Sequence, residues 1–104
     1  MEIGLFQLEN FFSLRAALLL DLRSNPGGSV HPEIDRYLAS AQPVIPDEVE
    51  NRLKSQGVDL EFPILLICEN GESSARVARV LEAAGFNNVY VVSGGIEGLL
   101  SELR

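Results

Sequence analysis

The sequence predicts an α/β domain with about five mostly parallel strands and helices on both faces of the sheet. Short apolar runs alternate with amphipathic segments along the chain, which is typical of βα units. Residues 64–68 (ILLIC) are apolar throughout, as expected for a parallel strand that is covered on both faces. Because the chain has 104 residues and no repeat or low-complexity tract, we expect one domain over residues 1–104.

Four further segments are expected to be strands. Residues 18–22 form an apolar run that ends at Asp21-Leu22, and residues 88–92 are rich in β-branched and aromatic side chains. Residues 42–45 include Pro43, which suits an edge strand or a bend, and residues 3–6 complete the set. The run at 64–68 is unbroken, so we place it at the centre of the sheet.

Four helices are expected to alternate with these strands. Residues at helical spacing mark them in chain order: Leu8, Phe11, Phe12 and Arg15; Val49, Leu53 and Gln56; Val77, Ala78, Leu81 and Ala84; Ile96, Leu99, Leu100 and Leu103. Pro46 opens the second helix and Gly57 closes it. Gly85 closes the third, and the pair Gly94-Gly95 precedes the fourth.

Composition excludes several classes of function. A net charge of −7 and a pI near 4.5 argue against nucleic acid as a partner. No apolar run is long enough to cross a membrane, and the N-terminus does not resemble a signal peptide, so we expect a cytoplasmic protein with no membrane partner. One cysteine and one histidine provide neither an internal disulfide nor a zinc site, and we expect no metal or cofactor.

Cys68 is the candidate nucleophile because it follows the central strand, at the edge of the sheet where ligands bind in open parallel sheets. The loop after it consists of Glu69, Asn70, Gly71, Glu72 and Ser73, and a helix starts near Ser73 or Ser74. Backbone amides and the N-terminus of this helix would favour the thiolate. Gly71 is expected to have a positive φ. Ser73 and Ser74 are suited either to hydrogen bonding with the sulfur or to capping the helix. The alternative for Cys68 is a purely structural role as a small, buried apolar residue.

These motifs resemble the C-terminal half of the rhodanese-like single-domain sulfurtransferases. The similar segments are Cys68-Glu-Asn-Gly-Glu-Ser-Ser-Ala, Ala84-Gly85-Phe86, Asn88-Val89-Tyr90 and Gly94-Gly95, and Asp21-Leu22-Arg23 resembles the Asp-x-Arg of the family. The resemblance covers residues 18–103. It implies a five-stranded parallel sheet and a reaction in which Cys68 receives a sulfane sulfur as a persulfide. The implied partners are a small sulfur-containing donor, a thiol or cyanide-type acceptor and, as a further option, a sulfur-relay protein.

Residues 24–46 depart from the family pattern. They contain the turn-rich SNPGGS, expected to be a loop, and His31, expected to be a turn residue. The stretch HPEIDRYLASAQPVIP stands in place of the family's Gly-His-Ile-Pro-Gly-Ala. In the cysteine loop, Glu69 and Ser73 occupy positions where many relatives carry arginine. The carboxylates of Glu69 and Glu72 would repel a dianion, so we expect weak use of thiosulfate and better use of a persulfide or polysulfide. Both side chains are expected to be free to point to solvent.

Two other functions compete with sulfur transfer. The lack of basic loop residues also fits a rhodanese-like binding module without turnover. A cysteine phosphatase or arsenate reductase would need arginine at the position of Ser74, and is disfavoured. Asp21 and Arg23 fit either support of an anion next to Cys68 or a structural ion pair.

Overall fold

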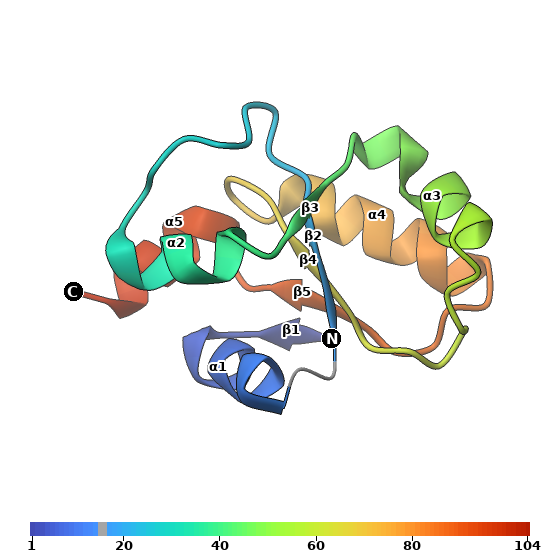
Figure 1. Cartoon of the computed structure of the whole chain (residues 1–104), viewed down its shortest axis with the longest axis horizontal. Coiled ribbons are helices and arrows are strands. Elements are labelled where there is room, and N and C mark those ends of the chain that lie inside the picture. The colour runs from blue at the N-terminus through green and yellow to red at the C-terminus, as the bar shows by residue number, and fades with distance from the viewer. Residues whose placement is uncertain (15–16) are drawn as a thin grey trace.

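The computed structural model describes residues 1–14 and 17–104, which form a five-stranded sheet between two layers of helices (Figure 1). The elements are β1 (Glu2–Ile3), α1 (Leu5–Leu14), β2 (Leu18–Asp21), α2 (Pro32–Leu38), β3 (Gln42–Pro43), a 3-10 turn (Pro46–Glu48), α3 (Val49–Ser55), β4 (Ile64–Ile67), α4 (Glu72–Ala83), β5 (Val89–Val92) and α5 (Gly95–Glu102). All strand pairs are parallel, in the order β1-β5-β4-β2-β3. The predicted α/β fold is confirmed.

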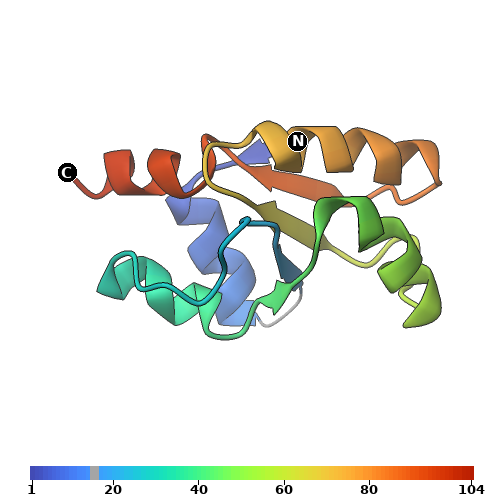
Figure 2. The ribbon, with the colours of Figure 1, turned by 90° about the horizontal axis from the view of Figure 1, so that it is seen from above.

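Each face of the sheet has its own hydrophobic core. One core contains the inward residues of α3 and α4, and the other contains those of α1, α2 and α5. Figure 1 shows these two groups of helices on opposite sides of the strands, and Figure 2 shows α2 and α3 at opposite ends of the molecule. Cys68 belongs to the core under α3 and α4, together with Leu66 and Val77.

The central position predicted for the apolar run at 64–68 is confirmed. All residues of β4 are buried, and β4 pairs with β2 on one side and β5 on the other. β3 is one of the two edge strands, and it tolerates Pro43 because one side of its backbone has no strand partner. Four-residue strands in this register bring Asp21 beside Ile67, so the segments after β2 and β4 start next to each other.

The strand expected at residues 3–6 is wrong beyond Ile3. β1 ends there because the next residues start α1: Gly4 O accepts a hydrogen bond from Leu8 N at 3.0 Å. Side chains satisfy free amides at this helix end, since Gly4 N donates to Gln7 Oε1 at 3.0 Å and Leu5 N to a carboxylate of α5. Arg15, assigned to the same helix from its spacing, lies outside the described residues.

Helix α2 is not among the helices expected from the sequence. His31, expected to be a turn residue, is its N-cap: Nδ1 accepts a hydrogen bond from Glu33 N at 3.1 Å. Ile34 and Tyr37 bury the inward face of the helix. The signal was present in the proline at the first helical position, the acidic first turn and the apolar spacing. None of the helices in the described residues is long and apolar enough to cross a bilayer.

Candidate functional site

Cys68 lies directly after β4, at the carboxyl end of the central strand, and its side chain points into the core under α4. Only 1% of the residue is exposed. Its Sγ accepts a hydrogen bond from Gly71 N at 3.1 Å. The expectation that a backbone amide turns back on the sulfur is therefore met by the geometry, and the thiol is more deeply buried than a residue on an open rim would be.

The shape of the cysteine loop depends on Gly71 and Asn70. Gly71 is the N-cap of α4 with φ +93°, so the predicted positive φ is confirmed. Asn70 Oδ1 accepts a hydrogen bond from Glu72 N at 3.0 Å and satisfies an amide of the first turn. The helix thus begins at Glu72, one residue before the expected start.

Neither serine of the loop is the N-cap of α4, because that position belongs to Gly71. Ser73 is half-buried, while Ser74 is fully buried among the inward residues of the helix. Ser74 Oγ has no hydrogen-bond partner among the described residues. This buried hydroxyl, rather than a cation, occupies the position at which a cysteine phosphatase needs arginine.

A second glycine-containing turn supports the cysteine loop from α5. Ile96 N donates to Cys68 O at 2.8 Å, and Glu97 N donates to Glu69 O at 3.0 Å. The close approach requires Gly95, because a Cβ there would overlap Cys68 O and lie 2.8 Å from Asn70 N. From the sequence, the paired glycines were expected to precede a helix and to match a family motif, and their support of the cysteine loop was not predicted.

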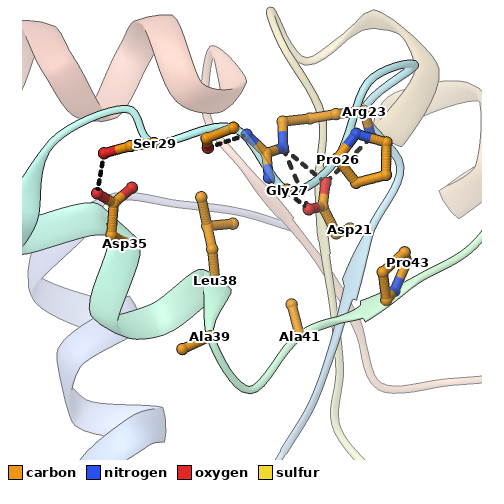
Figure 3. Close-up of a pocket in the computed structure, with 11 residues that line it drawn as sticks. Asp21, Arg23, Pro26, Gly27, Ser29, Asp35, Leu38, Ala39, Ala41 and Pro43 are labelled. Atoms are coloured by element: carbon orange, nitrogen blue, oxygen red, sulfur yellow. Dashed lines mark hydrogen bonds and ion pairs between the residues drawn. The ribbon is translucent and has the colours of Figure 1, made fainter.

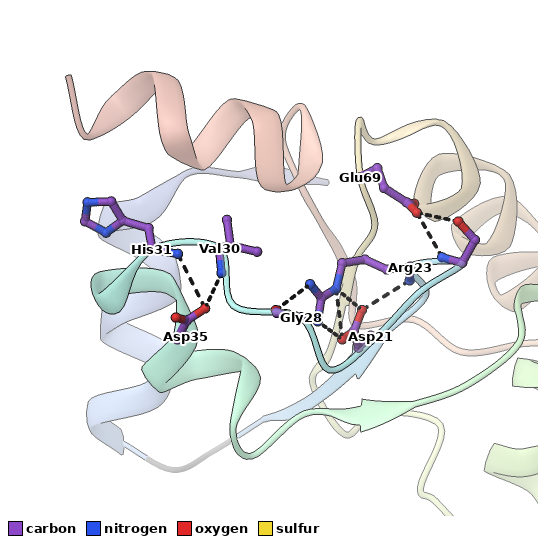
Figure 4. A network of polar contacts seen from close by, with 8 residues as sticks. Asp21, Arg23, Gly28, Val30, His31, Asp35 and Glu69 are labelled. Atoms are coloured by element: carbon purple, nitrogen blue, oxygen red, sulfur yellow. Dashed lines mark hydrogen bonds and ion pairs between the residues drawn. The ribbon is translucent and has the colours of Figure 1, made fainter.

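Glu69 does not extend into solvent as expected. Its Oε2 accepts two hydrogen bonds from Ser24, from the backbone N at 2.9 Å and from Oγ at 2.7 Å (Figure 4). The hydrogen bond from the Ser24 hydroxyl is the main cause that lowers the pKa of the Glu69 carboxyl. The bond from Ser24 N and the nearby guanidinium of Arg23 lower this pKa further. Glu72 is exposed, as expected. The contact between Glu69 and Ser24 links the loop after β4 to the loop after β2.

Asp21 and Arg23 form a structural ion pair. Arg23 Nε lies 2.9 Å from Asp21 Oδ1 and its Nη2 lies 2.8 Å from Oδ2, and the two side chains are only 8% and 4% exposed. Hydrogen bonding to Asp21 raises the pKa of Arg23. Figure 4 also shows the guanidinium directed to Gly28 O, at 3.5 Å. Of the two alternatives for Arg23, the geometry favours the structural one.

The loop at 24–29 and α2 enclose a pocket of about 430 Å³ (Figure 3). Its polar wall includes Asp21, Arg23 and Asp35, and its floor is made by small and apolar side chains such as Leu38. Asp35 Oδ2 accepts from Ser29 Oγ at 2.7 Å, and this bond, with others from the backbone, lowers the pKa of Asp35. The segment that departs from the family pattern supplies Asp35 and most of the lining, whereas Asp21 and Arg23 come from the family-like Asp-x-Arg motif. The described residues contain no cluster of three or more side chains that could hold a metal ion.

Comparisons with known proteins agree on one family. A family model described as "Rhodanese-like domain" matches residues 8–102. The chain is 30% identical over 83 residues to the thiosulfate sulfurtransferase GlpE of Pseudomonas fluorescens SBW25, a match that covers 80% of this chain and 70% of that protein. A shorter match to GlpE of Actinobacillus pleuropneumoniae serotype 3 is 46% identical over 41 residues and spans 39% of this chain and 38% of that relative.

Solved structures share the fold. The human single domain sulfurtransferase TSTD1 superposes with a TM-score of 0.75 at 18% identity, with 97% of this chain and 96% of that chain covered. A rhodanese homolog of Thermus thermophilus, TT1651, gives a TM-score of 0.68 at 23% identity, covering 95% of this chain and 100% of that one. The five-stranded parallel architecture implied by the sequence resemblance is thus confirmed.

Proposed function

Since the chain belongs to the rhodanese-like domain family, we propose that it is a sulfurtransferase that carries sulfane sulfur as a persulfide on Cys68. The observation that carries this proposal is the position of Sγ after the central strand, 3.1 Å from the amide of Gly71 and next to the N-terminus of α4. An amide donor and a helix N-terminus both stabilise a sulfur anion. The relatives named thiosulfate sulfurtransferase support the same reaction class.

The proposed reaction has two displacement steps. In the first, the thiolate of Cys68 attacks the outer sulfur of a donor R–S–SH, the S–S bond of the donor breaks, and R–S⁻ leaves with the electron pair. In the second, an acceptor thiolate attacks the outer sulfur of the Cys68 persulfide and the thiolate of Cys68 leaves. No net oxidation or reduction occurs, and no cofactor is required.

Charge around the thiol supports a preference for persulfide or polysulfide donors over thiosulfate. Glu69 is held as a carboxylate by Ser24, and Glu72 adds a second, exposed carboxylate to the same loop. Arg23 lies near Glu69, but Asp21 already neutralises it. A dianion therefore meets net negative charge near Cys68, at a cost of about 1 kcal/mol for each partly solvated pair.

Intact mass spectrometry tests the proposal. Protein treated with inorganic polysulfide should gain the mass of one sulfur atom, dithiothreitol should remove it, and Cys68→Ser should gain none. Parallel treatment with thiosulfate should give a smaller loaded fraction than polysulfide at equal concentration. An unmodified Cys68 under saturating polysulfide contradicts the proposed sulfurtransferase.

A binding module without turnover is the second candidate, and the burial of Cys68 favours it, since only 1% of the residue is exposed. Iodoacetamide distinguishes the two candidates. A sulfurtransferase must expose its thiolate during each cycle, so Cys68 should be alkylated in the folded protein at least as fast as a free thiol at the same pH. Alkylation that occurs only when the protein unfolds supports the module.

A further inference from the structure

A second pocket shares Arg23 and Pro26 with the first and lies between the segment after β3, helix α3 and the start of the loop after β2. Its volume is about 440 Å³, and its lining includes Ser24, Pro43, Ile45, Pro46, Glu48 and Arg52. The prolines and Ile45, which is 62% exposed, give it an apolar wall. Charged groups come from Glu48, from Arg52 and from Arg23, which is already paired with Asp21.

This pocket adjoins the cysteine loop, while Cys68 itself is buried and is not part of the pocket lining. Ser24 lines it and also donates both hydrogen bonds to Glu69, the residue that follows Cys68. β4, β2 and β3 are consecutive in the sheet, and neighbouring strands lie about 4.8 Å apart, so the end of β3 lies roughly 10 Å from the end of β4. An extended tripeptide, at about 3.4 Å per residue, spans the same distance.

Arg52 is the second cation of the pocket, beside the paired Arg23. It is half-buried, and it makes no ion pair with any carboxylate in residues 1–14 and 17–104. Lys54, on the same helix, is paired with Glu50 at 2.7 Å. A guanidinium recognises a carboxylate with two parallel hydrogen bonds, and the carboxylate of Glu48 in the same pocket suits an ammonium group.

We propose that this pocket binds the organic part of an amino-acid or short-peptide thiol, or of its persulfide, with Arg52 on a ligand carboxylate and Glu48 on the ammonium group. The proposal rests on the proposed sulfurtransferase function. The ligand chain lies along Pro43, Ile45 and Pro46, and its sulfur is directed past Ser24 to Cys68. Arg52 is then a specificity residue for the donor or acceptor, while the exchange of sulfur takes place at Cys68.

Binding of an unreactive analogue tests the pocket without turnover. S-methylglutathione carries the charges of a peptide thiol but cannot exchange sulfur, and its affinity can be measured by NMR titration at physiological salt. Arg52→Gln should weaken binding about tenfold, as expected for loss of one charge-assisted contact. Lys54→Gln removes the same charge from the same helix outside the pocket and should leave affinity unchanged. Absence of binding to the wild type, or equal affinity of the wild type and Arg52→Gln, overturns the proposal.

A sulfur-transfer assay distinguishes a failure of the proposed pocket from a failure of the proposed sulfurtransferase function. Cys68 loaded with inorganic polysulfide should pass sulfur to glutathione with a KM that rises about tenfold in Arg52→Gln, whereas the KM for 2-mercaptoethanol, which has no carboxylate, should not change. Failure of Cys68 to load refutes the sulfurtransferase and leaves the binding titration to decide on the pocket. If Cys68 loads normally and Arg52→Gln changes the KM for glutathione and for 2-mercaptoethanol equally, the pocket is refuted but the sulfurtransferase is not.

Discussion

Replacing Gly95 with alanine should disrupt the support of the cysteine loop. Gly95 has φ +61°, and a Cβ there would overlap Cys68 O and lie 2.8 Å from Asn70 N. Both neighbours are backbone atoms, so the turn before α5 must move away. The movement breaks the hydrogen bonds from Ile96 N to Cys68 O, at 2.8 Å, and from Glu97 N to the next carbonyl.

The expected loss of stability can be assembled from these parts. A positive φ costs alanine about 1 kcal/mol relative to glycine. Two weakened backbone hydrogen bonds add about 1 kcal/mol each, so Gly95→Ala should lower the free energy of unfolding by about 3 kcal/mol. Gly57 has nearly the same φ, +67°, but a Cβ there would have no neighbour within 4 Å. Gly57→Ala is therefore a matched control that should lose only about 1 kcal/mol.

Urea unfolding followed by far-UV circular dichroism measures the free energy of unfolding of both variants. The rate at which iodoacetamide alkylates Cys68 reports how well the cysteine loop is held. Gly95→Ala should be about 2 kcal/mol less stable than Gly57→Ala, and its Cys68 should react faster in the absence of urea because the loop has lost its support. Equal stabilities for the two variants, within about 0.5 kcal/mol, would refute the packing argument. An unchanged alkylation rate would show that the turn does not control the loop.

Three other predictions follow from the polar contacts around the loop. Glu69→Ala removes both bonds to Ser24 and should raise the alkylation rate of Cys68 severalfold, whereas Glu72→Ala removes an equal charge from the loop without breaking this link and serves as the control. Since the pKa of Glu69 is lowered in the folded protein, its contribution to stability is present above the ordinary carboxyl pKa and is lost as the pH falls through the folded value. The stability difference between wild type and Glu69→Ala should therefore shrink as the pH is lowered from about 6 to about 3, by less than about 1 kcal/mol because the contact is partly exposed; a constant difference in urea titrations would contradict this assignment. Arg23→Met leaves Asp21 buried without its ion partner and should cost about 3 kcal/mol, most of which should return in Asp21→Asn/Arg23→Met if the loss comes from the uncompensated charge.

Local patterns in the sequence determined the sheet and the place of the thiol. Four successive apolar residues before Cys68 can be buried only if both faces of that strand are covered, which places the strand at the centre. Gly71 and the helix that follows it were recognisable because turn and helix preferences act over a few residues. The strand expected at residues 3–6 was wrong beyond Ile3 because contacts of Gly4 with Gln7 and of Leu5 with α5 hold the start of α1 there.

Only the tertiary structure decided what surrounds the thiol. Ser24 and Glu69 are 45 residues apart in sequence, and they meet because β2 and β4 are neighbours in the sheet. The order β4-β2-β3 likewise places Arg52 in one pocket with Ser24 of the loop after β2, and the packing of α5 brings Gly95 against the cysteine loop. The order of parallel strands depends on which helices cover which face. Periodicity within one segment carries no information about that choice, so the position and turn of the cysteine loop could be predicted from the sequence and its neighbours could not.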